Sequence, residues 1–249
     1  FVSEVACVKK FFNDREFYTK LLIIGLPVII QQLLLTTFGI VDTLMVKSIY
    51  RGIGGVGLAN QMSMIAGTIV FGLNVGVGLF IAQFFGDKDE ENMKRSFALM
   101  TMLCFLIATF FTIVGFFFGD EVLMLFNKDP EILATGHAYL IIAVFSYIPN
   151  LLAFSFSIAY RNIQKTFVPL LVSIVSSIFN ITFNYFLIFG IWIFPELGIR
   201  GAAIATVISS FVALGAHIIY ARATKQVFLP KLRHYMEALH KNFFTEILQ

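Results

Sequence analysis

Residues 58–85 read LANQMSMIAGTIVFGLNVGVGLFIAQFF, without a single Asp, Glu, Lys or Arg. A helix needs about 20 mostly apolar residues to cross the hydrocarbon core of a bilayer, and this stretch exceeds that length. The polar side chains that it contains are uncharged amides and hydroxyls. The stretch therefore predicts a transmembrane helix, with the lipid bilayer as a partner.

Five more stretches have the same character, and the short segments between them hold nearly all the charged residues. The predicted helices span about residues 17–46, 58–85, 96–119, 132–160, 167–194 and 201–221. Hydrophobic residues make up 58% of the chain and charged residues 13%, whereas a soluble domain carries about 25% charged residues. No stretch alternates polar and apolar residues for long enough to suggest a β-barrel. We therefore predict an all-α integral membrane protein with six transmembrane helices.

The lysines and arginines divide unevenly between the two sides of a six-helix topology. The side that carries both chain ends holds 14 of them, and the other side holds 4, namely Lys47, Arg51, Lys128 and Arg200. Because cytoplasmic loops carry the excess of Lys and Arg, we expect both ends to be cytoplasmic in a multi-pass protein of the cell (inner) membrane. With five or seven helices, the lysines and arginines would no longer separate between the two sides in this way.

Motifs of soluble enzymes are absent from the sequence. There is no G-x-S-x-G, no H-E-x-x-H and no phosphate-binding loop. The histidines, His137, His217, His234 and His240, are scattered without the spacing of metal ligands. We expect no enzyme, no catalytic residue, no metal site, no cofactor and no nucleic-acid partner.

The polar residues inside the predicted spans are more informative. Asp42 is the only acidic residue well inside an apolar segment, and an ionisable group in a span is by default a functional-site hypothesis. A second interpretation is an interfacial carboxylate paired with Lys47, five residues later. Asn180 and Asn184 share one face of the fifth helix because they are spaced i, i+4. By themselves they could equally join helices through amide hydrogen bonds.

Pro27 lies early in the first predicted helix, where it frees a backbone carbonyl and permits a kink. One interpretation is a plain structural kink. The other is a hinge in a protein that opens alternately to the two sides of the membrane.

Several short motifs together resemble one transporter family. They are VDTLMV at 41–46, AQFFG at 82–86, YRNIQKTFVP at 160–169, NITFN at 180–184 and GIRGAAIAT at 198–206. Singly each motif is weak, but together they resemble the multidrug and toxic compound extrusion (MATE) transporters over residues 22 to about 222.

The resemblance implies one lobe of a twelve-helix transporter that is built from two six-helix lobes. Residues 1–16 are then a cytoplasmic N-terminal segment, residues 17–222 the N-terminal lobe, and residues 223–249 a cytoplasmic linker that leads to a missing C-terminal lobe. The implied function is secondary antiport, in which cationic or amphipathic drugs and toxic compounds leave the cell in exchange for sodium ions or protons.

The resemblance also implies a coupling-cation site. In this family the acidic residue of the first helix binds the proton or sodium ion, and a polar pair on the fifth helix and a threonine on the sixth complete the pocket. The matching positions are Asp42, Asn180, Asn184 and Thr206, which helix rise places at similar depth in the outer half of the lobe. Two departures stand out: some members carry an acid in place of Asn184, and the family usually has glycine in place of Lys47.

Two other classes of function stay open. A lipid-linked oligosaccharide flippase of the same wider superfamily would share the architecture, but we expect it to line its cavity with more basic residues, and the spans show none. A channel subunit usually needs a repeated pore loop, and an intramembrane enzyme needs a second catalytic polar group on a facing helix. Neither feature is evident.

Overall fold

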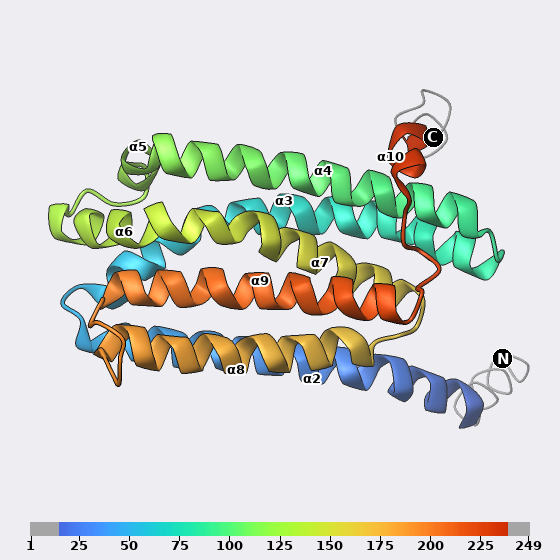
Figure 1. The fold of residues 1–249 in the computed structure, drawn as a ribbon, viewed down its shortest axis with the longest axis horizontal. Coiled ribbons are helices and arrows are strands. Elements are labelled where there is room, and N and C mark those ends of the chain that lie inside the picture. The colour runs from blue at the N-terminus through green and yellow to red at the C-terminus, as the bar shows by residue number, and fades with distance from the viewer. Residues whose placement is uncertain (1–14, 239–249) are drawn as a thin grey trace, which may run out of the picture.

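The computed structural model describes residues 15–238, which form a bundle of long helices without a strand in that range (Figure 1). The α-helices are α2 (Arg15–Met45), α3 (Gly52–Gly86), α4 (Glu90–Phe117), α5 (Gly119–Met124), α6 (Pro130–Ala143), α7 (Tyr147–Asn162), α8 (Phe167–Phe189), α9 (Ile199–Ala223) and α10 (Leu232–Ala238). Two 3-10 segments, η1 (Val46–Ser48) and η2 (Val144–Ser146), extend α2 and join α6 to α7. Six helical segments are long and apolar enough to span a membrane, which confirms the predicted class.

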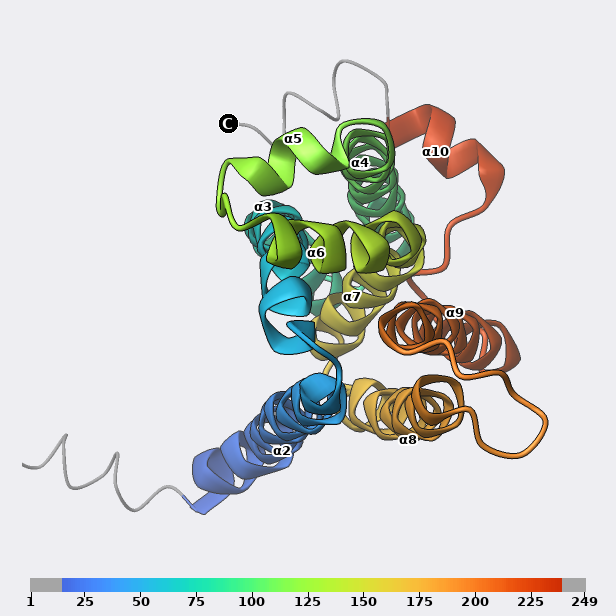
Figure 2. The same ribbon diagram turned by 90° about the vertical axis from the view of Figure 1, so that its left-hand side faces the viewer.

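The fourth span lies at the centre of the bundle and the first at its edge. The fourth consists of α6, η2 and α7, and 56% of its apolar window is buried against other helices. Only 11% of the corresponding window of the first span is buried, because α2 packs chiefly against α8. Seen end-on in Figure 2, α2 stands beside α8 and its N-terminal part leaves the bundle.

The centre of the fourth span is broken at η2. The hydroxyl of Thr112 on α4 donates a hydrogen bond to the carbonyl oxygen of Val144 (3.1 Å). Another hydroxyl, that of Ser146, donates to the carbonyl oxygen of Ala143 (2.6 Å). Side chains thus satisfy two carbonyls at the break, as backbone groups require where no water reaches them.

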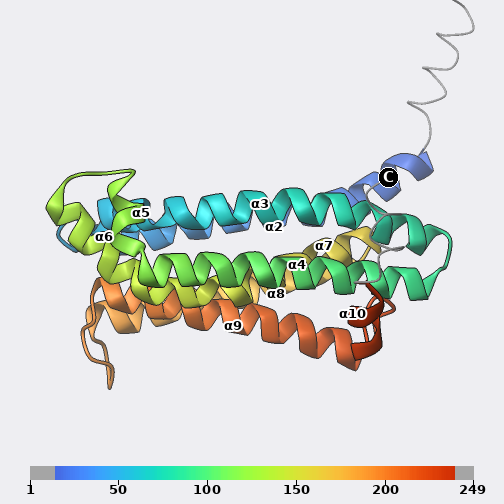
Figure 3. The same ribbon diagram turned by 90° about the horizontal axis from the view of Figure 1, so that it is seen from above.

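Both described chain ends lie at the same end of the bundle (Figure 1). We call it the basic end, because it carries most of the described cations: Arg15, Lys88, Lys94, Arg95, Arg161, Lys165, Arg222, Lys225, Lys231 and Arg233. The opposite end, which we call the far end, carries Lys47, Arg51, Lys128 and Arg200. Figure 3 shows from above that the α3–α4 connection and α10 lie at the basic end, whereas α5 and the α8–α9 connection lie at the far end.

The second helix begins earlier than the predicted start at about residue 58. α3 starts at Gly52, so the glycine-rich residues 52–57 are helical. Gly55 is buried against α6, where a Cβ would lie only 2.7 Å from Cγ2 of Thr135. Gly55 therefore serves the close packing of α3 on α6 rather than a loop.

Two other helix boundaries also differ from the prediction. α4 begins at Glu90 rather than at about residue 96, because the Asp89 carboxylate caps it by accepting from the backbone N–H of Asn92 (3.0 Å). α8 ends at Phe189 rather than at about residue 194, because Gly190 adopts a left-handed conformation with φ of 64°. Hydropathy locates the apolar stretch, whereas the caps set the helix ends.

The predicted linker contains an unpredicted helix, α10, which returns to the bundle and packs on α4. Nη2 of Arg233 lies 2.8 Å from Oε2 of Glu91, and Nε2 of His234 lies 3.0 Å from the same oxygen. Nε of Arg95 lies 2.9 Å from Oε2 of Glu237. These contacts hold the segment after α9 against the basic end. The rest of the predicted linker and nearly all of the predicted segment 1–16 lie outside the described residues.

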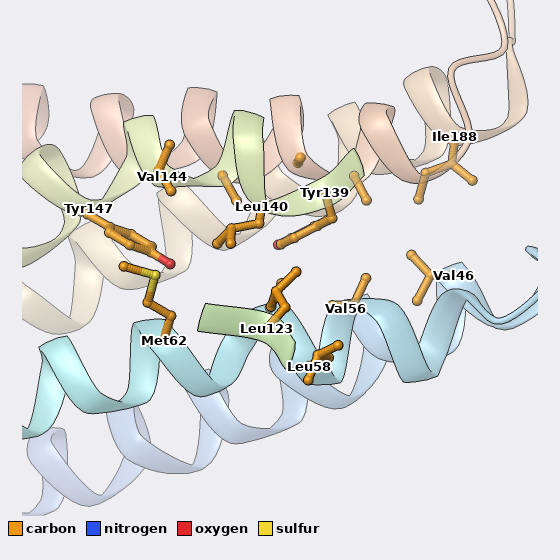
Figure 4. Packing of buried hydrophobic residues seen from close by; sticks show 14 residues of the cluster. Val46, Val56, Leu58, Met62, Leu123, Tyr139, Leu140, Val144, Tyr147 and Ile188 are labelled. Atoms are coloured by element: carbon orange, nitrogen blue, oxygen red, sulfur yellow. The ribbon is translucent and has the colours of Figure 1, made fainter. Parts of the chain in front are cut away.

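A cluster of apolar side chains fills the far half of the bundle between α3, α6 and α9 (Figure 4). It includes Val46, Val56, Leu58, Met62, Leu123, Tyr139, Leu140, Val144, Tyr147 and Ile188. Two of these, Tyr139 and Tyr147, bring hydroxyl groups into an otherwise apolar region. This packing fixes the position of Tyr139 beside the site described next.

Candidate functional site

Asp42 lies near the end of α2, where this helix packs against α8. Its side chain accepts a hydrogen bond at Oδ1 from Nδ2 of Asn184, a residue of α8 that is fully buried. The same nitrogen donates to Oδ1 of Asn180, one turn earlier on α8 (3.2 Å). Nδ2 of Asn180 in turn donates to Oγ of Ser209 on α9 (3.3 Å). A chain of hydrogen bonds therefore links α2, α8 and α9.

The second amide atom of Asn184 is unsatisfied. Its Oδ1 is buried and has no hydrogen-bond partner within residues 15–238. Burying an acceptor without a donor is unfavourable, so this oxygen is available to a proton donor or to a bound cation. It lies on the same side chain that contacts the carboxylate of Asp42.

Thr206 joins the hydrogen-bond chain through its backbone, because its carbonyl oxygen accepts from Oγ of Ser209 (3.0 Å). Its Oγ1 donates to the carbonyl oxygen of Ala202 (3.0 Å) and lies 3.3 Å from the hydroxyl of Tyr139. Asp42, Asn180 and Thr206 all line one hollow of about 190 Å³. The other lining residues are Leu35, Phe38, Gly39, Asn150, Ser176, Ser177, Ser209, Ser210 and Ala213.

The ion pair between Asp42 and Lys47 does not form. Lys47 is exposed in η1 and makes no ion pair with Asp42. The interpretation of Asp42 as an interfacial partner of this lysine is therefore wrong.

A second hollow of about 420 Å³ adjoins the first on the side of the basic end. Gln31 and Arg161 line it, and Nη2 of Arg161 donates to Oε1 of Gln31 (2.8 Å). Nε2 of Gln31 donates to Oγ of Ser173 (2.7 Å) and to the carbonyl oxygen of Pro169 (3.2 Å). The two hollows share the lining residues Leu35, Asn150, Ser176 and Ala213.

Arg161 corrects one sequence-based expectation. It lies in the fourth apolar helix, which runs over Pro130–Asn162, so the spans do contain a basic residue that lines a cavity. In the described part of the chain Arg161 has no carboxylate partner, and its Nε is buried without a hydrogen-bond acceptor. One arginine held by a glutamine still differs from a broadly basic cavity.

Some polar residues of the site were not among the predicted ones, and their signals in the sequence differ. Ser209 follows Thr206 by three residues, and Ser176 precedes Asn180 by four, so a helical repeat of polar residues could have found both. Tyr139 gives no such signal, because it is one of many aromatic residues in the apolar segments. Only the packing of α6 against α9 brings its hydroxyl to Thr206.

The chemistry of the site is that of hard oxygen ligands. It offers one carboxylate, amide oxygens and hydroxyl groups, which suit a proton or a monovalent hard cation better than a soft metal. Pro27 lies outside this hollow; it is buried within α2, which continues through it as one helix.

Comparison with known proteins places this geometry in a family. The MatE family model matches residues 27–186. A probable multidrug resistance protein NorM of Thermotoga maritima is 27% identical over 243 residues, which cover 93% of this chain and 52% of the relative. Another protein of that name, from Rhizobium meliloti, is 30% identical over 211 residues, covering 82% of this chain and 42% of the relative.

A solved structure shares the fold. It is described as the outward-facing conformation of a multidrug resistance MATE family transporter of the MOP superfamily. It superposes with a TM-score of 0.79 at 19% identity and covers 92% of this chain and 50% of that chain. The chain thus spans about half the length of the curated relatives it matches. It belongs to the MatE family, the multidrug and toxic compound extrusion transporters, which are membrane transporters and not enzymes.

Proposed function

We propose that this chain forms one lobe of a secondary antiporter that exports cationic or amphipathic compounds in exchange for sodium ions or protons. Membership of the family supports transport as the activity. The proposal adds the substrate class, the coupling ion and a second lobe, which it assigns to a further six-helix segment of the same protein. The length of the relatives supports that assignment.

The observation that carries the proposal is the environment of Asp42. Its carboxylate lies in an apolar helix, with one amide donor from Asn184 and no ion pair within the described residues. A charge away from water is unfavourable unless it is paired. A proton on the carboxylate or a bound monovalent cation would neutralise it, and the free Oδ1 of Asn184 is suited to contact either one.

The position of the site suggests how an ion could be coupled to a drug. Asp42 is on α2 and Asn184 is on α8, and α8 is the helix against which α2 chiefly packs. Neutralising Asp42 alters that contact, and the adjoining hollows lie along the same helices. Cation and substrate can then compete through conformation, each favouring a different state. A hinge at Pro27 would let the N-terminal part of α2 move when the contact between α2 and α8 changes.

The test is Asp42→Asn in the protein that carries both lobes, reconstituted into proteoliposomes. The expected result is loss of efflux driven by a sodium or proton gradient, with folding retained by size-exclusion chromatography. Asp120→Asn is the matched control, because Asp120 is an exposed carboxylate at the far end. Applying the two gradients separately identifies the ion. If Asp42→Asn exports normally, the site is wrong.

The proposed orientation has its own test. Both described ends of the chain are assigned to the cytoplasm. In a cysteine-free background, single cysteines at Lys128 and Lys165, both exposed and at opposite ends of the bundle, should react with an impermeant reagent from opposite sides. Labelling of both positions from one side contradicts this topology.

A flippase for lipid-linked oligosaccharides is the second candidate, and Arg161 is the observation that favours it. A guanidinium in a cavity suits an anionic headgroup. Cationic-dye efflux by the two-lobe protein supports the exporter, whereas translocation of a lipid-linked oligosaccharide without dye efflux supports the flippase. We prefer the exporter, because Arg161 is held by Gln31 while Asp42 has no counter-ion within residues 15–238.

A further inference from the structure

A groove of about 570 Å³ opens at the basic end, on a different face from the two hollows. Its lining comes from α4, α7, α9 and the segment that follows α9. The basic lining residues are Arg222, Lys225 and Lys231; the apolar ones are Phe97, Leu152, Phe156, Leu214, Ile218, Leu229 and Pro230; and the polar ones are Thr101, Gln226 and Tyr235. No Asp or Glu lines the groove.

The three cations are exposed, and the described part of the chain gives them no acidic partner. Arg222, Lys225 and Lys231 form no ion pair with a carboxylate among the described residues. Nearby cations at the same end behave differently, since Arg95 pairs with Glu237 and Lys94 pairs with Glu90. Three cations that converge on one groove without an acidic partner among residues 15–238 form a site suited to an anion.

The apolar wall continues from these cations toward the middle of the bundle. Leu214, Ile218 and Arg222 follow one another at intervals of four along α9, so they form a single stripe on its surface. At about 1.5 Å per residue, Leu214 lies about 12 Å deeper than Arg222. The same spacing recurs on α4, with Phe97 and Thr101, and on α7. The groove is therefore charged at its mouth and apolar along its length.

The mouth of the groove is held in place. After α9 the chain turns back, and α10 is clamped onto α4 by the contacts of Glu91 and Glu237 described above. The backbone N–H of Lys231 also donates to Nδ1 of His234 (2.7 Å). This clamp keeps Lys225 and Lys231 near Arg222, so the cluster does not depend on a free tail.

We propose that this groove binds an anionic phospholipid. The phosphodiester would contact Arg222, Lys225 and Lys231, and one acyl chain would lie along Leu214 and the apolar side chains beside it. Basic pockets at the ends of membrane helices recognise such headgroups, and the long apolar wall would be of no use to a small soluble anion. The ligand is a component of the membrane, independent of the exported compound and of the coupling ion.

Native mass spectrometry of the chain, released from micelles that contain dioleoylphosphatidylglycerol or dioleoylphosphatidylcholine, tests the proposal. We expect one phosphatidylglycerol retained per chain in preference to phosphatidylcholine. Arg222→Gln/Lys225→Gln should weaken retention by about 30-fold, because each charge near an anionic headgroup contributes about fivefold. Arg15→Gln/Lys88→Gln is the matched control: it removes two exposed charges from the same end, outside the groove, and should leave retention unchanged.

Two further arms separate a lipid from other anions. Millimolar glycerol 3-phosphate should not displace the lipid, and Leu214→Trp, which fills the apolar wall without changing charge, should reduce retention. Leu106→Trp, at an exposed position of α4 outside the groove, is its control. Equal retention of both lipids, equal loss in both charge variants, or full displacement by glycerol 3-phosphate would overturn the proposal.

Discussion

The two adjoining hollows have opposite polarity, although they share one wall. At the far end, Asp42 supplies a negative charge and Asn184 leaves an acceptor without a donor. Toward the basic end, Arg161 supplies a positive charge and leaves its Nε donor without an acceptor. Gln31 there has both ends of its amide satisfied, through three hydrogen bonds.

The comparison shows two ways of holding the same helix. α2 meets its neighbours at Gln31 and, about 16 Å farther along, at Asp42. The Gln31 contact is saturated by the protein alone, so it suits a permanent attachment. The Asp42 contact is incomplete, so its strength can depend on a bound ion. The following predictions test this difference.

Replacing Gln31 should have the largest effect on stability. Gln31→Leu removes three hydrogen bonds and leaves the guanidinium of Arg161 without the one partner that it has among the described residues. We expect this change to lower the free energy of unfolding by about 3 kcal/mol. Reversible unfolding in mixed detergent and sodium dodecyl sulfate measures it. Gln32→Leu is the control, because the side chain of this neighbouring glutamine is exposed. Equal losses of stability in both variants would contradict the interpretation of the Gln31 contact as a permanent attachment of α2.

Asn184→Leu should destabilise the chain by about 2 kcal/mol, because Asp42 loses its donor while remaining in an apolar surrounding. The matched variant is Asn180→Leu, which removes an amide one turn away that does not touch Asp42 and should cost less. Saturating sodium or low pH should reduce the difference in stability between the two variants, since either one neutralises the carboxylate of Asp42. If neither condition changes this difference, the contact between Asp42 and Asn184 does not depend on a bound ion.

Thr206→Val is expected to cost about 1 kcal/mol, the usual value of one buried hydrogen bond, because it breaks the contact with the hydroxyl of Tyr139. Thr68→Val serves as control: the hydroxyl of Thr68 bonds only the carbonyl of Met64 in its own helix. Thermal unfolding of the two variants side by side is sufficient. If Thr68→Val is the more harmful, Thr206 contributes nothing specific to the site.

The smallest effect is expected for Lys47→Ala, within about 0.5 kcal/mol of the parent chain. Lys47 is exposed and does not pair with Asp42, so its removal should leave both unfolding and ion-driven efflux unchanged. A large loss in either measurement would restore the paired interpretation of Asp42 that the geometry excludes.

Hydropathy and the distribution of lysine and arginine were sufficient to predict six membrane helices. They could not predict the ends of those helices, because Asp89 and Gly190 act through backbone capping, and Gly55 through contact with α6. Helix α10 was not predicted for another reason: its attachment to the bundle depends on Glu91, a residue far away in the sequence. Local periodicity contains no information on such contacts.

The candidate site shows the same limit. Asp42, Asn180 and Asn184 are unusual residue types in apolar helices and could be named directly. Tyr139 could not, because tyrosine occurs at several positions in these segments and only the packing of the helices distinguishes one from another. The predicted fourth helix ends at about residue 160, just before Arg161, and the position of Arg161 in a hollow depends on its contact with Gln31 of α2.

The break at residues 144–146 bears on how the protein is made. α6 has 14 residues and α7 has 16, and neither reaches the roughly 20 residues that a bilayer crossing needs. The insertion machinery must therefore accept both as a single apolar segment. The hydroxyl of Thr112 that satisfies the carbonyl at the break comes from α4, which leaves the ribosome earlier. The hydrogen bond that satisfies the break in the fourth span thus comes from α4, a helix that precedes it into the membrane.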